Sequence, residues 1–260
     1  MRFAAPRITW MVQRLILANA IVFAIQLVAD PIEALLLPQY WSGYPPSGLL
    51  TTWLGFQPDL FLGGFIWKPF TYQFLHAGLL HLFLNMLWLF FFGADVERAL
   101  GSRQFLRFYI LCGALGVMAT MLPYLLRGDA PSVSGASGAV MGVMVAFAMI
   151  EPDRQFFLFP LPVPITARAL VLIVVVMNII TALGESSVSV ATHFGGMATG
   201  YGYMKLLPVF RGWQRERRRQ MRERDEARRE RAGGGEEYDE VGKMVDNIFK
   251  FKDYDDRDRH

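Results

Sequence analysis

The sequence predicts an all-α membrane protein with six membrane-spanning helices. Of the 260 residues, 53% are hydrophobic, which is more than an ordinary soluble α/β domain carries. The apolar residues gather in long blocks without a charged side chain, instead of alternating with polar residues. Stretches such as "LVLIVVVMNII" are apolar on every face, and this pattern excludes a membrane β-barrel.

Each predicted span is a block of residues without Asp, Glu, Lys or Arg. A helix needs about 20 apolar residues to cross the hydrocarbon core of a bilayer. The blocks are 15–29, 69–94, 108–126, 130–150, 169–184 and 186–204. The first block extends back to Trp10, with Arg14 reaching the interface. No small-residue cleavage site follows the first apolar run, so we expect no cleavable signal peptide. We therefore predict one six-span domain over residues 1–208.

The arginines predict how the chain is oriented in the membrane. The connections at 95–107 and 151–168 carry three and two arginines, whereas the segment 30–67 contains no Lys or Arg. By the positive-inside rule, we expect both termini in the cytoplasm and the segment 30–67 on the outer side. This segment is rich in Trp, Tyr, Pro and Leu, so we predict that it lies embedded at the membrane surface.

Residues 209–260 are predicted to form a charged cytoplasmic tail. Residues 211–231 hold ten arginines and five acidic residues, whereas residues 236–260 hold nine acidic and five basic residues. Interspersed Arg and Glu indicate a solvated helix over 211–231 that touches anionic lipid, followed by an acidic end. The acidic residues and the lack of a base-reading motif argue against a nucleic-acid partner.

Polar side chains at membrane depth are costly, so they are candidates for function. His81 and Asn85 are four residues apart and share one face of a helix, with His76 expected in the turn before it. Ser137 stands just inside the start of the fourth block, in "GASGAVMG", and His193 stands near the start of the sixth, in "ATHFGGMATG". The predicted topology places Ser137, His81, Asn85 and His193 at similar depth on the outer side.

Glycine pairs follow the serine and the last histidine. Gly138 begins a G-x-x-x-G pair directly after Ser137, and Gly196 and Gly200 form another after His193. Such pairs let two membrane helices approach closely. If these two helix faces pack together, the serine hydroxyl and the histidine ring come within hydrogen-bond distance. Taken alone, each pair is also compatible with ordinary helix packing.

This pattern points to serine-based hydrolysis. A serine hydroxyl becomes nucleophilic when a base accepts its proton, and histidine is the usual base. The Ser137 backbone N–H and the side chains of His81 and Asn85 would donate to the oxyanion that forms. No acidic residue of these spans lies near His193, so the sequence predicts a dyad and not a triad.

Other chemistries fit less well. A zinc site formed by His76, His81 and His193 stays an alternative, but it leaves Asn85 and Ser137 without a role. The sequence has no H-E-x-x-H motif and no mid-span aspartate pair, and an alanine replaces the second glycine of G-x-S-x-G. The single cysteine excludes a cysteine-based metal cluster, and we expect no cofactor and no bound metal.

Taken in order, these features resemble the rhomboid family of intramembrane serine proteases, over roughly residues 8–208. The matching motifs are Trp67–Lys68, His76-x4-His81-x3-Asn85, "GADVERALGSRQFLRFY", Gly135–Ala136–Ser137–Gly138 and His193-x2-Gly196-x3-Gly200. The resemblance implies that Ser137 is the nucleophile and His193 the general base. It also implies that His81 and Asn85 form the oxyanion hole and that His76 supports this region. The other supporting positions are Trp67, Lys68, Gly135, Gly138, Met141, Gly196 and Gly200.

Two positions depart from the family pattern. Met141 stands where many members have an aromatic residue, and its sulfur can still contact the histidine ring. Lys68 replaces the arginine of a Trp-Arg pair and lacks the bidentate fork of a guanidinium group.

The resemblance implies a multi-pass protein of the cell or inner membrane with an embedded first outer loop and water reaching the serine from outside. The expected function is an endopeptidase that cuts single-span membrane proteins in or near their transmembrane segments. The alternative is a non-catalytic rhomboid-like protein that binds transmembrane clients. A channel is disfavoured because no intramembrane carboxylate or cation marks a path. The sequence sets no oligomeric state.

Overall fold

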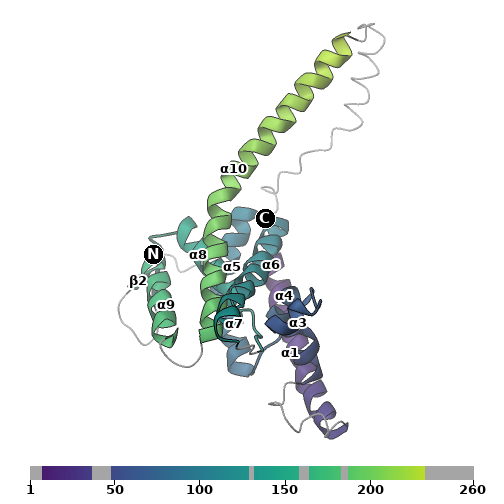
Figure 1. Ribbon diagram of the computed structural model, residues 1–260. Helices are drawn as coiled ribbons and strands as arrows, with labels where there is room; N and C mark the ends of the chain where they lie inside the picture. Colours follow the sequence, from purple (N-terminus) through teal and green to yellow (C-terminus); the bar gives the residue numbers. More distant parts are fainter. Residues whose placement is uncertain (1–7, 37–47, 129–131, 158–163, 183–186, 232–260) are drawn as a thin grey trace. The chain divides into compact units, whose positions relative to one another are not determined.

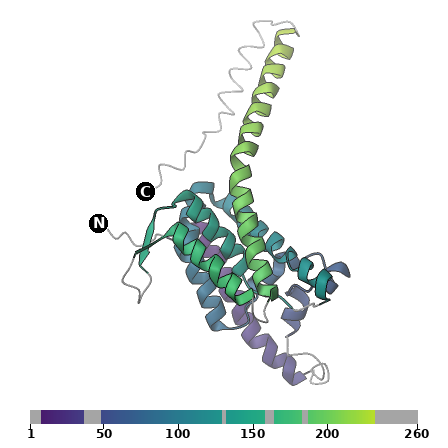
Figure 2. The ribbon, with the colours of Figure 1, turned by 60° about the vertical axis from the view of Figure 1, so that its left-hand side comes forward.

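Long helices that pack against one another carry the predicted site residues. The computed structural model describes residues 8–36, 48–128, 132–157, 164–182 and 187–231. The chain divides into two compact units, residues 1–205 and residues 206–260. In the first unit, α8 packs against α5 and α6, and α1 packs against α5; Figures 1 and 2 show these helices side by side. These helices are α1 (Trp10–Leu36), α5 (Leu79–Leu100), α6 (Ser102–Met118) and α8 (Ser137–Ile150).

The other helices and the two strands precede α5 or follow α6 in the chain. Those that precede α5 are α2 (Leu49–Leu54), α3 (Pro58–Leu62), α4 (Lys68–Thr71) and the 3-10 helix η2 (Tyr72–Phe74). Those that follow α6 are α7 (Met121–Arg127), β1 (Gln155–Phe157), β2 (Pro164–Thr166), α9 (Ala167–Ala182) and α10 (Ser187–Arg231). The helix α10 includes the Arg-rich residues 211–231, whereas the predicted acidic end, 236–260, lies outside the described residues.

Three helical segments among the described residues are long and apolar enough to cross a membrane. They are Trp10–Asp30, Leu79–Leu100 and Ser102–Arg127. The apolar helices α8 and α9 have 14 and 16 residues. At 1.5 Å per residue they are about 21 and 24 Å long, which is less than the roughly 30 Å of a hydrocarbon core. The protein is thus a helical membrane protein, and the count of six spans stays a prediction.

The predicted second span, residues 69–94, is wrong at its start, because α5 begins only at Leu79. In the turn before α5, the backbone N–H of His76 donates to Gln26 Oε1 on α1 at 3.0 Å. This side-chain acceptor replaces the carbonyl that a continuous helix would have supplied. A charge-free run therefore indicates apolar surroundings but does not locate the first residue of a helix.

The predicted connection at 95–107 is also wrong, because almost all of it is helical. The helix α5 continues to Leu100, and α6 begins at Ser102. Gly101 alone separates them, with a φ of +82° that an L side chain rarely adopts. The arginines of this region therefore lie on the ends of two helices.

A small hairpin departs from the predicted all-α class. The strands β1 and β2 pair antiparallel within the predicted loop 151–168. Phe156 in β1 anchors this hairpin, because its ring lies 5.6 Å from that of Phe147 on α8. An aromatic residue on a half-buried strand favours such pairing. The hairpin therefore fixes the C-terminal end of α8.

Glu97 near the end of α5 caps the start of α1. Its carboxylate is 3% exposed and accepts the backbone N–H groups of Met11 at 3.1 Å and Val12 at 2.9 Å. The hydroxyls of Thr9 and Ser102 also donate to it. The first N–H groups of a helix have no partner within the helix, so this buried carboxylate satisfies them and suits the positive helix end.

Candidate active site

Ser137 and His193 lie within hydrogen-bond distance of each other. Ser137 is the first residue of α8, and His193 lies in the second turn of α10. The Ser137 Oγ and the His193 Nε2 are 2.9 Å apart, and both side chains are half-buried. A hydroxyl beside an imidazole nitrogen at this distance can pass its proton to the ring.

The glycine pairs bring these two helices together. A Cβ added to Gly196 would overlap the carbonyl group of Gly138, and one added to Gly200 would lie 2.6 Å from the carbonyl oxygen of Gly142. On a third side, a Cβ on Gly116 of α6 would lie 3.0 Å from the backbone nitrogen of Gly196. The close approach predicted from the glycine spacing is therefore found in the structure.

Asn178 on α9 contacts the other nitrogen of the His193 ring. Its Oδ1 lies 2.6 Å from His193 Nδ1, and its Nδ2 donates to the backbone oxygen of Val174 at 2.8 Å. The side chain is buried, with 8% of the residue exposed. Our sequence analysis missed Asn178, although it is a lone polar residue inside the run "LVLIVVVMNII". The rule that polar residues are costly at membrane depth would have identified it.

The segment that leads into Ser137 is held by backbone hydrogen bonds. Phe56 and Val133 exchange two of them, with N···O distances of 3.0 and 2.8 Å. The Gly135 N–H donates to the backbone oxygen of Tyr72 at 3.1 Å, and the Tyr72 hydroxyl donates to the Gly113 carbonyl at 2.7 Å. These contacts tie the start of α8 to α6 and to the turn that follows α4.

Three predicted site residues lie around this segment in different ways. A Cβ on Gly135 would lie 2.5 Å from His81 Cε1, so the His81 ring covers the backbone just before Ser137. The Ala136 N–H donates to His76 Nε2 at 3.5 Å, and the rings of His76 and His81 are 5.2 Å apart. The Asn85 amide is buried and donates to the His81 backbone oxygen at 2.8 Å. The structure thus brings both histidines to the segment, whereas the Asn85 amide donates to a carbonyl of its own helix.

Metal binding by the three histidines is not supported by this arrangement. Within the part of the chain that the structure describes, no group of three or more His, Cys, Asp or Glu side chains could hold a metal ion. The His193 ring instead faces Ser137 and Asn178. Met141 is half-buried on α8, one turn after the serine, and its predicted contact with the histidine ring stays a prediction.

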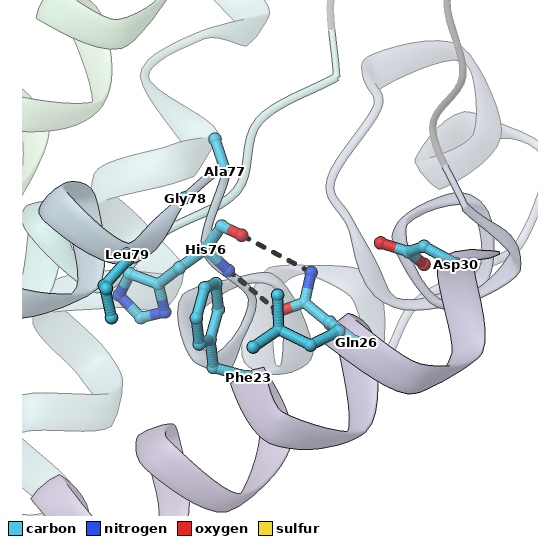
Figure 3. A pocket seen from close by; sticks show the side chains of 8 residues that line it. Phe23, Gln26, Asp30, His76, Ala77, Gly78 and Leu79 are labelled. Carbon is cyan, nitrogen blue, oxygen red and sulfur yellow. Dashed lines mark hydrogen bonds between the residues drawn. The ribbon is translucent and has the colours of Figure 1, made fainter.

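Gln26 on α1 holds the turn that contains His76. Its Oε1 accepts the His76 N–H at 3.0 Å, and its Nε2 donates to the His76 carbonyl at 3.5 Å (Figure 3). A cavity of about 270 Å³ lies beside this pair, lined by Phe23, Leu27 and Leu79 among others. Gln26, like Asn178, is a buried polar residue of a predicted span that our sequence analysis did not single out.

Lys68 is fully buried and holds the segment before it. Its ammonium group donates to the backbone oxygens of Thr52 at 2.5 Å and Gly55 at 2.9 Å, and to Gln57 Oε1 at 3.2 Å. Burial lowers the pKa of this ammonium group, and the nearby Asp59 carboxylate acts in the opposite direction. Three acceptors match the three N–H bonds of a lysine, so this residue anchors the segment without a guanidinium fork.

Trp67 and Thr71 add to this anchor. The Trp67 indole N–H donates to the Trp53 backbone oxygen at 3.1 Å, and the Thr71 hydroxyl donates to the Leu54 backbone oxygen at 2.7 Å. Residues 37–47 of the first outer segment lie outside the described residues. The membrane-embedded loop therefore stays a prediction.

Fold and site together define a helical membrane protein with a half-buried serine and histidine in hydrogen-bond contact. The family model of the Rhomboid domain matches residues 64–209, which is more than half of the chain, and the chain belongs to the rhomboid family.

The curated relatives match this chain over part of their length. The Rhomboid protease GluP of Bacillus subtilis (strain 168) is 31% identical over 138 residues, which cover 52% of this chain and 25% of the relative. The RHOMBOID-like protein 4 of Arabidopsis thaliana is 34% identical over 154 residues, covering 58% and 37%. The Rhomboid protease GlpG of Salmonella newport (strain SL254) is 31% identical over 98 residues, covering 35% and 32%. The chain thus spans between a quarter and somewhat more than a third of the length of these relatives.

Proposed function

We propose that the protein is an intramembrane serine endopeptidase that cuts membrane proteins in or near their transmembrane segments. The observation that carries the proposal is the 2.9 Å distance between Ser137 Oγ and His193 Nε2, inside a bundle of apolar helices. The chain belongs to the rhomboid family and has relatives named proteases, which also supports protease activity.

The reaction follows from this pair. His193 Nε2 takes the hydroxyl proton while Ser137 Oγ forms a bond to the carbonyl carbon of the substrate peptide. The same proton then passes to the leaving amine as the C–N bond breaks, which leaves an acyl-enzyme. A water molecule repeats the two steps, releases the carboxylic acid and restores the serine.

The negative oxygen of the tetrahedral intermediate needs donors nearby. Ser137 is the first residue of α8, so its backbone N–H has no acceptor within that helix. We assign two further donors, the His81 ring and the second N–H of the Asn85 amide. An amide group carries two such hydrogens, and one of them is used on the His81 backbone oxygen. Fixed donors in a site of low polarity stabilise the oxyanion strongly.

The proposed substrate is a single-span membrane protein. Large apolar side chains are exposed on α5 and α9, including Leu80 at 69% and Leu172 at 63%. Such faces suit lipid or an apolar substrate helix. We further propose that both termini lie in the cytoplasm and that the serine opens to the outer side, as the arginine distribution indicates.

A serine-directed fluorophosphonate probe tests the proposed nucleophile. We expect the wild type to be labelled and Ser137→Ala to stay unlabelled, with labelling of His193→Ala slower by at least about 100-fold. Cys112→Ala is the matched control, because Cys112 is a buried residue of α6 that the proposed reaction does not use. Full labelling of Ser137→Ala would contradict the proposal. An unlabelled wild type would instead favour the non-catalytic protein that binds transmembrane clients.

A further inference from the structure

The contacts of Asn178 determine which nitrogen of the His193 ring carries the hydrogen. The Asn178 Nδ2 lies 2.8 Å from the Val174 backbone oxygen, which only accepts hydrogen bonds. The amide nitrogen must therefore face Val174, and the amide oxygen must face the ring, 2.6 Å from His193 Nδ1. An oxygen that only accepts requires a hydrogen on that ring nitrogen, so Nδ1 is the protonated position.

This tautomer is the one that a general base needs. When Nδ1 of a neutral imidazole carries the hydrogen, Nε2 carries the lone pair. That lone pair then faces the Ser137 hydroxyl at 2.9 Å. The opposite tautomer would point an N–H at the serine and could not take its proton. The chain of contacts from Val174 through Asn178 to His193 therefore determines whether Ser137 can be activated.

We propose that Asn178 is a positioning residue that holds His193 in the tautomer and orientation required for attack by Ser137. This inference rests on the proposed function and adds a third residue to the predicted dyad. A carboxylate commonly fills this place in soluble enzymes. A neutral amide supplies the same acceptor without placing a charge between membrane helices, where a charge is costly.

The position of Asn178 in α9 makes the proposal testable by substitution. Its neighbours Met177, Ile179 and Ile180 are 56%, 50% and 57% exposed, so this part of α9 makes little other buried contact. Thr181 on the next turn is exposed, and its hydroxyl donates to the Met177 backbone oxygen at 2.8 Å. Thr181→Val thus removes a polar group from the same helix without touching His193, and it serves as the matched control.

The experiment compares full-length wild type with Asn178→Leu, Asn178→Asp and Thr181→Val in liposomes. The kinetic readout is cleavage of a purified single-span reporter, with kcat and KM determined separately. The structural readout is the ¹⁵N chemical shift of labelled histidine, which distinguishes a protonated ring nitrogen from a bare one. The His193 signals are assigned by their loss in His193→Ala.

We expect Asn178→Leu to lower kcat at least about tenfold while KM stays within about twofold, because the ring loses its orienting acceptor. The wild-type His193 should be protonated at Nδ1, and Asn178→Leu should populate the other tautomer. Asn178→Asp keeps an acceptor oxygen whether or not it is ionised, so it should recover most of the activity. Thr181→Val should match the wild type in both readouts.

Either of two results would overturn the positioning role when Asn178→Leu folds. One is an Asn178→Leu variant with wild-type kcat, and the other is a wild-type His193 that carries its hydrogen on Nε2. If Asn178→Leu does not fold, failure of the folded Asn178→Asp to keep the Nδ1–H tautomer also overturns it. A wild type that cleaves nothing contradicts the proposed function. If its His193 is still protonated at Nδ1, and Asn178→Leu still changes that tautomer, the positioning role is supported.

Discussion

At the scale of single residues, Gly135 lies in a closely packed part of the backbone just before the serine. Its φ of +122° is rarely adopted by L side chains, and a Cβ there would lie 2.5 Å from His81 Cε1. The same residue also donates its N–H to the Tyr72 backbone oxygen. Glycine is therefore required both for the backbone conformation and for the space that the His81 ring occupies.

Gly135→Ala should lower both stability and activity. The strained backbone costs about 1–3 kcal/mol of unfolding free energy, and the displaced His81 ring should reduce reporter cleavage at least about tenfold. Gly64→Ala is the control, because Gly64 has a φ of +102° but nothing within 4 Å of the added Cβ. Thermal unfolding and cleavage assays measure both effects. Equal cleavage rates for the two variants would show that the contact with His81 does not matter.

The polar residues that the sequence analysis identified have informative sequence neighbours, and those that it missed do not. Ser137 and His193 stand beside glycine pairs, and the need of each for a partner could be inferred from that spacing. Asn178 and Gln26 lie singly in apolar runs, and their partners are more than ten residues away in the sequence. The spacing of residues along one sequence does not indicate which of them pair over such separations. The polarity of these residues could have been noticed, but their partners come from the fold alone.

At the scale of elements, the contact between α8 and α10 decides whether the serine meets the histidine. The two helices touch backbone to backbone at Gly196 and Gly138, where a Cβ would overlap the carbonyl group. The sequence predicted this contact, because small residues four apart form one face of a helix. The helix boundaries were harder to predict. The backbone is extended at Leu75, and the His76 N–H bonds to Gln26 instead of to a helix carbonyl, so α5 begins only at Leu79 although no residue there is charged.

Gly196→Ala is expected to destabilise the protein, whereas Gly202→Ala is not. Alanine favours a helix over glycine by about 1 kcal/mol, so Gly202→Ala, which meets nothing within 4 Å, should be neutral or slightly stabilising. Gly196→Ala must push α10 away from α8, so it should lower the unfolding temperature and reduce cleavage at least about tenfold. A Gly196→Ala variant as stable and active as Gly202→Ala would contradict the close packing of these helices.

At the scale of the whole molecule, the residues of the site come from a larger part of the chain than the matched domain. The Rhomboid domain covers residues 64–209, yet α1 lies before it and supplies Gln26 to the turn of His76. The start of α1 is also capped by the buried Glu97 of α5. The first helix is thus bonded at its start to α5 and, through Gln26 in its second half, to the turn before α5.

Removal of residues 211–260 should leave the chemistry intact. Ser137, Asn178 and His193 all belong to the unit of residues 1–205, and the tail belongs to the other unit. We expect kcat of the deletion variant to stay within about twofold of the wild type, with weaker binding to anionic vesicles because about 1 kcal/mol is lost per arginine near the surface. Loss of cleavage by a correctly inserted deletion variant would show that catalysis requires the tail.

The most direct test of the account is cleavage of a purified single-span reporter by the full-length protein in liposomes. Wild type is compared with Ser137→Ala, His193→Ala and Cys112→Ala. We predict that the wild type and Cys112→Ala cut at the same site, and that the two other variants lose at least about 1,000-fold in kcat. Undiminished cleavage by Ser137→Ala, or no cleavage by a correctly inserted wild type, would contradict the assignment of this protein as a serine endopeptidase.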